Sequence, residues 1–212
     1  LIMNKVYKLL DLSITIWLII VIFVVSFIGL MNPQILNLIA FYPYYATTYP
    51  WMFITSIFGS GSLMHLFFNV MALLFLGLLF EYLYGSKNLL ILFLLSGIVG
   101  NMFFLFQYYN DPLVAGIGAS AAISGILGAL GVLNPKEKVI MFPMIIPIDI
   151  RYAVIFWIIF NLIGMFYPFV PLGFSAHLGG TLFGLLYGYI LKKHKGKTSI
   201  DNIFDNQEEI YL

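Results

Sequence analysis

Long apolar runs, interrupted by short clusters of charged residues, organise the chain. No charged residue occurs between Asp11 and Glu81 or from 152 to 191, and shorter charge-free runs lie at 88–110 and 112–135. A helix that crosses a bilayer needs about 20 apolar residues. The pattern therefore predicts an all-α membrane protein, a bundle of six transmembrane helices at about 13–31, 63–84, 88–108, 115–133, 152–167 and 174–191.

The segments between these runs carry the residues that end helices. Residues 32–62 are rich in Pro, Tyr, Thr, Ser and Gly, which predicts a long loop at the membrane interface. The sequence YPFVPLG at 167–173 interrupts the last apolar run with two prolines and a glycine. Residues 139–150 are apolar but hold Pro143 and Pro147, so we expect a connector that lies at the membrane surface.

Composition agrees with this class. The 212 residues are 62% hydrophobic and only 9% charged, whereas soluble domains carry about 25% charged residues. We expect one membrane domain over 1–191, embedded in the lipid bilayer, and a short cytoplasmic tail over 192–212. The chain has no cysteine, which excludes disulfides and thiolate metal sites, and its net charge of +1 gives no reason to expect nucleic acid as a partner.

The positions of the basic residues predict the orientation of the bundle. The chain has ten Lys and Arg residues, and with six spans all of them fall on one side of the membrane. Cytoplasmic loops carry the excess of Lys and Arg. We therefore expect both termini to be cytoplasmic, whereas five or seven spans would scatter these charges over both sides.

Three polar residues share one depth near the opposite, outer face. His65, Ser120 and His177 each lie about two to five residues into an even-numbered span. At about 1.5 Å per residue, all three lie roughly 3–8 Å below the outer boundary. Ionisable residues inside a membrane are costly and are candidates for function, so this shared layer predicts a site there.

Small residues predict that two of these spans lie in close contact. Gly180, Gly184 and Gly188 recur on one face of the last span, and Ala121 and Gly125 belong to a similar face of the fourth. Such faces let helix backbones approach closely. Packing between the two faces would bring the hydroxyl and the imidazole of the candidate pair, Ser120 and His177, within hydrogen-bond reach.

A serine beside a histidine is a nucleophile beside a base, because the hydroxyl needs a neighbour to take its proton. His65 and Asn69 are one helical turn apart, so both can donate hydrogen bonds to one oxyanion. No carboxylate lies at this depth, which predicts a Ser–His dyad without an acidic third member. No metal or other cofactor is expected, because a catalytic zinc needs three protein ligands and this layer offers two histidines.

Each of these residues also has a structural interpretation. Ser120 and Ser124 can simply pack in a helix rich in Gly and Ala, and Asn69 can join two helices through a hydrogen bond. A transporter or channel is a further alternative, but the inner halves of the fourth and sixth spans are nearly all apolar and offer no polar path.

Four motifs, in order, resemble the rhomboid intramembrane serine proteases. They are HLFFN at 65–69, GLLFEYLYG at 77–85, GAS at 118–120 and AHLGGTLFG at 176–184, and the resemblance covers about residues 50 to 190. It implies a six-helix rhomboid core in which Ser120 attacks a peptide bond and His177 is the general base. It also implies that His65, Asn69 and the Ser120 amide stabilise the oxyanion, and that Gly118, Gly180 and Gly184 pack helices near the site.

The resemblance implies a serine-type endopeptidase whose substrates are single-span transmembrane proteins, cleaved near the outer end of their helix. The alternative is an inactive rhomboid-like protein that binds transmembrane helices. The absence of extra domains favours a prokaryotic plasma membrane, with the site open to the extracytoplasmic side.

Three positions depart from the family's usual pattern: Met52, Ala121 and Ser124. Ser124 replaces an aromatic residue that stacks on the histidine in the family, so the sequence leaves open how the His177 imidazole is held.

Overall fold

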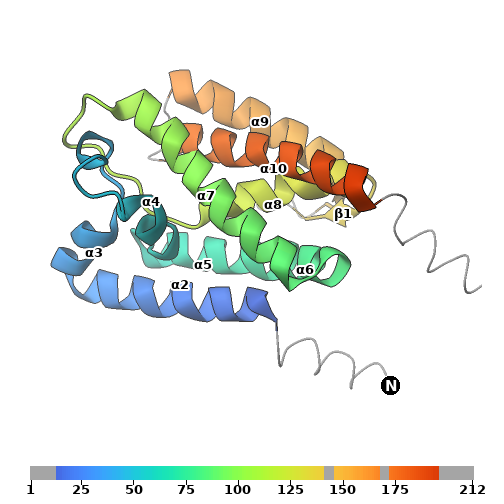
Figure 1. Cartoon of the computed structure of the whole chain (residues 1–212), viewed down its shortest axis with the longest axis horizontal. Coiled ribbons are helices and arrows are strands. Elements are labelled where there is room, and N and C mark those ends of the chain that lie inside the picture. The colour runs from blue at the N-terminus through green and yellow to red at the C-terminus, as the bar shows by residue number, and fades with distance from the viewer. Residues whose placement is uncertain (1–12, 141–145, 168–171, 196–212) are drawn as a thin grey trace, which may run out of the picture.

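The computed structural model describes residues 13–140, 146–167 and 172–195, and most of them are helical (Figure 1). The long elements are α2 (Ile14–Met31), α5 (Leu63–Ala72), α6 (Leu78–Tyr84), α7 (Ser86–Tyr108), α8 (Ser120–Leu133), α9 (Ile150–Phe166) and α10 (Phe174–Lys195). The short ones are α3 (Pro33–Ile39), η1 (Pro43–Tyr45), α4 (Met52–Thr55), η2 (Ser56–Phe58), the π-helical η3 (Leu73–Gly77), and strands β1 (Lys138–Val139) and β2 (Ile148–Asp149).

Four helices in the described residues are long and apolar enough to cross a membrane: Ile14–Met31, Leu63–Tyr84, Ser86–Tyr108 and Phe174–Lys193. The second of these joins α5, η3 and α6 into one rod. The helices Ser120–Leu133 and Ile150–Phe166 are apolar but shorter, with 14 and 17 residues. The prediction of a mostly helical membrane protein is confirmed, with four long apolar helices and these two shorter ones.

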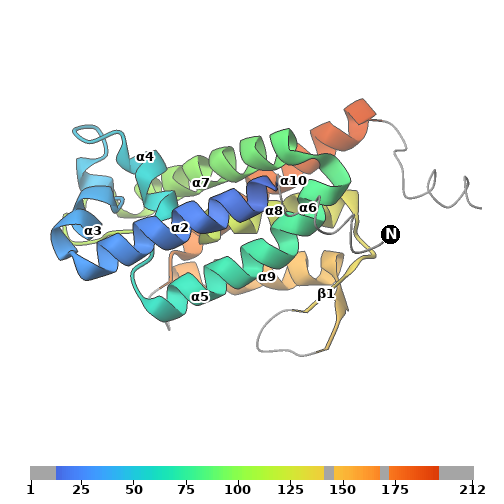
Figure 2. The same ribbon diagram turned by 90° about the horizontal axis from the view of Figure 1, so that it is seen from below.

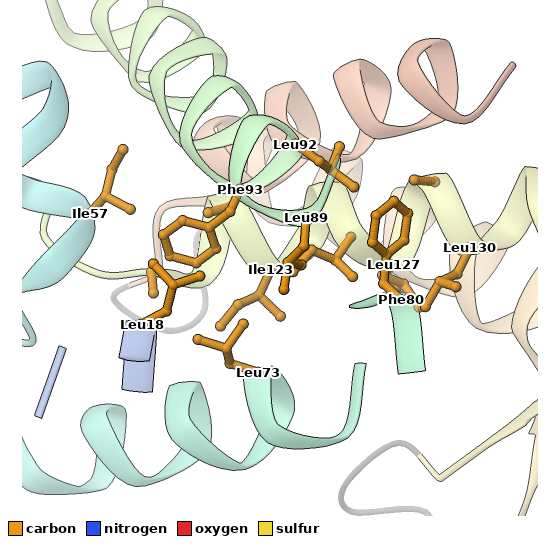
Figure 3. Close-up of a cluster of buried hydrophobic side chains, with 14 of the residues drawn as sticks. Leu18, Ile57, Leu73, Phe80, Leu89, Leu92, Phe93, Ile123, Leu127 and Leu130 are labelled. Carbon is orange, nitrogen blue, oxygen red and sulfur yellow. The ribbon is translucent and has the colours of Figure 1, made fainter. Parts of the chain in front are cut away.

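Helix α8 lies at the centre of the bundle, against α7, α9 and α10 (Figures 1 and 2). Every residue from Ala121 to Leu130 is buried, as expected for a helix that is apolar all round and lies inside a bundle. The largest cluster of buried side chains joins α8 to α2, to the rod of α5–α6 and to α7 (Figure 3). The central helix therefore has neighbours that hold its position from several sides.

Glycines let α8 and α10 approach until their backbones are in contact. A methyl group placed on Gly180 or Gly184 would overlap the carbonyl oxygen of Ala121 or Gly125, respectively. One placed on Gly188 would lie 2.8 Å from the Ala129 carbonyl oxygen. The repeat of glycines every four residues thus runs along the seam between the two helices, as the sequence pattern predicts.

Glu81 of α6 ties the second span to the first. Its carboxylate accepts hydrogen bonds from the hydroxyls of Ser13 and Thr15, both at 2.7 Å, and from the backbone N–H groups of Ile14 and Thr15. The Ser86 hydroxyl donates to the same carboxylate at 2.6 Å. A carboxylate at a helix N-terminus satisfies N–H groups that have no partner within the helix, so Glu81 anchors the start of α2.

Three details differ from the sequence-based expectations. The fourth helix begins at Ser120 and not at 115, because the residues before Ala119 are not helical: Gly116 forms a β-bridge with Phe41, and Gly118 has a φ of 148°. Helix α10 continues to Lys195, beyond the predicted end at 191. The predicted connector at 139–150 overlaps a short antiparallel pair of strands, β1 and β2, in which Lys138 is opposite Asp149. Residues 141–145 of this connector, and the tail after 195, lie outside the described residues.

Candidate active site

The segment before α8 is held in an extended conformation by the long first loop. Gly116 and Phe41 exchange two backbone hydrogen bonds of 2.8 Å, and the Gly118 N–H donates to the Ser56 carbonyl oxygen at 2.9 Å. Gly118 has a φ of 148°, which L-residues with a side chain rarely adopt. The extended segment ends at Gly118; Ala119, with φ −73° and ψ −6°, is the N-cap, and Ser120 is the first residue of α8.

Ser120 and His177 lie in hydrogen-bond contact across the seam between α8 and α10. The distance from Ser120 Oγ to His177 Nε2 is 2.7 Å. His177 is buried, whereas Ser120 is only partly buried. A hydroxyl in contact with a neutral imidazole nitrogen can pass its proton to that nitrogen as it attacks an electrophile.

Helix α9 holds the other ring nitrogen of His177. Asn161 Oδ1 lies 3.0 Å from His177 Nδ1, and Asn161 Nδ2 donates to the Trp157 carbonyl oxygen at 2.7 Å. Asn161 is fully buried, with 0% of its surface exposed. Because its amide nitrogen is already directed at a carbonyl, its oxygen is the atom that faces the imidazole.

An indole covers one face of the same imidazole. The rings of Trp157 and His177 are stacked, with centroids 5.4 Å apart and an interplanar angle of 27°. Trp157 Nε1 donates to Ser124 Oγ at 2.9 Å, and the Ser124 hydroxyl donates to the Ser120 carbonyl oxygen at 2.7 Å. The imidazole therefore has an aromatic neighbour even though position 124 is a serine, because Ser124 anchors the Trp157 ring of α9 against it.

His65 and Asn69 of α5 converge on Gly118, two residues before Ser120. A methyl group on Gly118 would lie 2.8 Å from His65 Nε2 and 3.5 Å from Asn69 Nδ2. Asn69 is buried, and its Nδ2 has no hydrogen-bond partner in the part of the chain that the structure describes. A buried donor without a partner costs free energy, so this amide beside Gly118 is suited to bind an acceptor group that a ligand brings.

Comparison with known proteins identifies the family of the chain. The family model for the rhomboid domain matches residues 47–194. The chain belongs to the rhomboid family. The resemblance of its four motifs is thereby confirmed, and the match begins within the first loop and ends in α10.

Several curated rhomboid proteins are similar to the chain. Rhomboid protein 1, mitochondrial, from Saccharomyces cerevisiae is 30% identical over 143 residues, which cover 66% of this chain and 41% of that protein. Rhomboid protease AarA from Providencia stuartii is 34% identical over 151 residues, 62% of this chain and 53% of that protein. Inactive RHOMBOID-like protein 8 from Arabidopsis thaliana is 34% identical over 80 residues, 38% of this chain and 22% of that protein.

The chain spans about half or less of the length of these relatives. The relatives are mostly rhomboid proteases, and one of them is an inactive protein. Family membership at these identities therefore favours protease activity.

The rhomboid site contains two residues that the sequence did not single out. Asn161 and Trp157 lie four residues apart on α9, so both project from one face of that helix. Asn161 is the one amide side chain inside the apolar run of α9. A polar side chain in that position is the sequence signal that could have identified it. Gly118, which we expected to pack two helices, lies before α8 and instead makes room for the His65 ring.

Proposed function

We propose that this rhomboid is an intramembrane serine endopeptidase. Ser120 Oγ attacks the carbonyl carbon of a peptide bond, and His177 Nε2 takes the hydroxyl proton and returns it to the leaving amine. Water then hydrolyses the acyl-enzyme, with His177 as its base. The observation that carries this proposal is the 2.7 Å contact between Ser120 Oγ and His177 Nε2, with a partly exposed nucleophile and a buried base.

Negative charge that develops on the substrate oxygen needs donors already in position. We assign this role to the side chains of His65 and Asn69 and to the Ser120 backbone N–H. The Asn69 amide without a partner among the described residues supports the assignment, as does the N-terminal position of Ser120 on α8, where backbone N–H groups have no helical acceptor.

The substrates that fit this site are single-span transmembrane proteins, cleaved near the outer end of their helix. Six spans with both termini on the cytoplasmic side follow from the ten basic residues, which all fall on one side in that arrangement. Ser120 then lies near the extracytoplasmic face, where water reaches it. We also propose a plasma-membrane location, with the site open to that extracytoplasmic side.

A serine-reactive fluorophosphonate probe tests the proposal directly. Purified protein in detergent is expected to form a covalent adduct, and peptide mapping by mass spectrometry is expected to place it on Ser120. Ser124, four residues later in the same peptide, is the internal control, because its hydroxyl already donates to the Ser120 carbonyl oxygen. A folded protein that stays unlabelled, and that leaves a generic single-span substrate intact in liposomes, would contradict the proposal.

That negative result would favour the alternative, an inactive rhomboid that binds transmembrane helices. The similarity to Inactive RHOMBOID-like protein 8 over 80 residues is the observation in its favour. In that case Ser120 would contribute packing alone, and binding of a single-span helix would persist in Ser120→Ala.

Gly118→Ala is expected to lower the rate of probe labelling by about 10²-fold, the usual effect of losing one oxyanion donor. The added methyl group would meet the His65 ring, with 2.8 Å to Nε2, and the φ of 148° is strained for alanine. Labelling kinetics in detergent measure the effect. Gly61→Ala is the matched control, because its methyl group would meet Ile117 Cγ2 at an ordinary 3.6 Å; equal rates in both variants would contradict the assignment of His65.

A further inference from the structure

The predicted Ser–His dyad has a third polar neighbour that the sequence-based interpretation lacks. Asn161 is wholly buried in α9, and its Oδ1 lies 3.0 Å from His177 Nδ1, on the far side of the imidazole from Ser120. A base that also contacts a third group is the arrangement that activates serine nucleophiles in general. The question is what a neutral amide does in that place.

The hydrogen-bond network determines which nitrogen of His177 carries the proton. Asn161 Nδ2 donates to the Trp157 carbonyl oxygen at 2.7 Å, and the reversed amide would direct oxygen against oxygen. Asn161 Oδ1 is therefore an acceptor, and His177 Nδ1 must be its donor. The remaining nitrogen, Nε2, then has a free lone pair toward the Ser120 hydroxyl, since the hydrogen bond at one ring nitrogen sets the state of the other.

The orientation of the ring is held by the same helix. Trp157 stacks on the imidazole face, and its Nε1 is anchored by Ser124 Oγ at 2.9 Å. Asn161 thus holds the edge of the ring and Trp157 its face, one helical turn apart on α9.

We propose that Asn161 is a positioning residue of this rhomboid, which keeps His177 in the Nδ1–H tautomer and directs Nε2 at Ser120. This proposal rests on the proposed protease function for its effect on rate, but the tautomer of His177 can be measured independently of activity. Asn161 touches no substrate, and it acts through the imidazole alone.

Two substitutions separate acceptance of a hydrogen bond from packing. Asn161→Leu removes the acceptor and is expected to lower the rate of fluorophosphonate labelling of Ser120 by about 10- to 100-fold, a part of the 10²–10⁴ that a positioned base contributes. Asn161→Asp keeps an acceptor toward Nδ1 but sets its second carboxylate oxygen against the Trp157 carbonyl oxygen, so it is expected to recover only part of that loss. A role in packing alone predicts the opposite order, because the buried carboxylate that Asn161→Asp introduces would be the costlier change.

Asn134→Leu is the matched control. Asn134 is also a buried amide, and it accepts a hydrogen bond from the Tyr84 hydroxyl at the other end of α8. Its loss removes a comparable hydrogen bond without touching His177, so labelling is expected to stay within about twofold of wild type once thermal unfolding in detergent confirms a folded protein.

The tautomer itself is read by NMR of protein labelled with ¹⁵N-histidine, with the His177 signals assigned by their loss in His177→Ala. Wild type is expected to show a protonated Nδ1 and an unprotonated Nε2, and Asn161→Leu a mixture of both tautomers. A proton on Nε2 in wild type, or wild-type labelling by Asn161→Leu, would overturn the proposal. If wild type gives the expected tautomer but no labelling, the protease function fails while the positioning by Asn161 stands.

Discussion

Ser120→Ala is expected to reduce cleavage of a single-span substrate in liposomes by about 10⁴-fold or more, and His177→Ala to do the same. A nucleophile and its base act as one unit, so the loss of either removes nearly all that the pair contributes. The double variant is therefore expected to be no slower than either single variant. The 2.7 Å contact between Ser120 Oγ and His177 Nε2 is the physical reason to expect this coupling.

Ser26→Ala is the matched control for Ser120→Ala. Ser26 is a fully buried serine of α2, and its hydroxyl donates only a long hydrogen bond of 3.4 Å to the Phe58 carbonyl oxygen. Its removal is expected to leave cleavage unchanged. If the effects of Ser120→Ala and His177→Ala on cleavage multiplied in the double variant, the two residues would act independently, and the proposed proton transfer between them would be wrong.

The sequence predicted the parts of this site that follow from helix periodicity. His65 and Asn69 are one turn apart on α5, and the glycines at 180 and 184 recur along one face of α10. Apolar length and these intervals were enough to predict the bundle and the approach of α8 to α10. Each of these intervals lies within one helix, where the relative directions of the side chains are set by 3.6 residues per turn.

The contribution of α9 could not be predicted in this way. Trp157 and Asn161 reach His177 only because α9 is rotated so that this face meets α10, and no interval within α9 reveals that rotation. The start of α8 at Ser120 depends likewise on backbone hydrogen bonds that the preceding segment makes with Phe41 and Ser56, which are remote in sequence. The sequence left open how the His177 imidazole is held, because the partner of Ser124, the indole of Trp157, comes from another helix.

Gly184→Ala is expected to destabilise the protein by about 1–3 kcal/mol and to slow labelling of Ser120 by about 10²-fold. The added methyl group would overlap the carbonyl oxygen of Gly125, which is backbone and cannot rotate away as a side chain can. The helices α8 and α10 must then move apart, which costs the free energy of an overpacked core. A displacement of about 1 Å between reacting groups is enough to cost 10²-fold in rate.

Gly29→Ala provides the comparison, as the same substitution in another apolar helix. Its methyl group would meet the Leu36 Cδ1 atom at 3.0 Å, the far end of a flexible side chain. Alanine also favours a helix by about 1 kcal/mol over glycine, so the stability of this variant is expected to stay close to that of wild type. Thermal unfolding in detergent, followed with labelling kinetics on the same samples, measures both quantities. Ser120 and His177 belong to the two helices that Gly184 holds together. The labelling rate of Gly184→Ala is therefore expected to fall by more than its unfolded fraction explains. A fall that only follows the unfolded fraction would mean that the seam contributes stability without setting the geometry of the site.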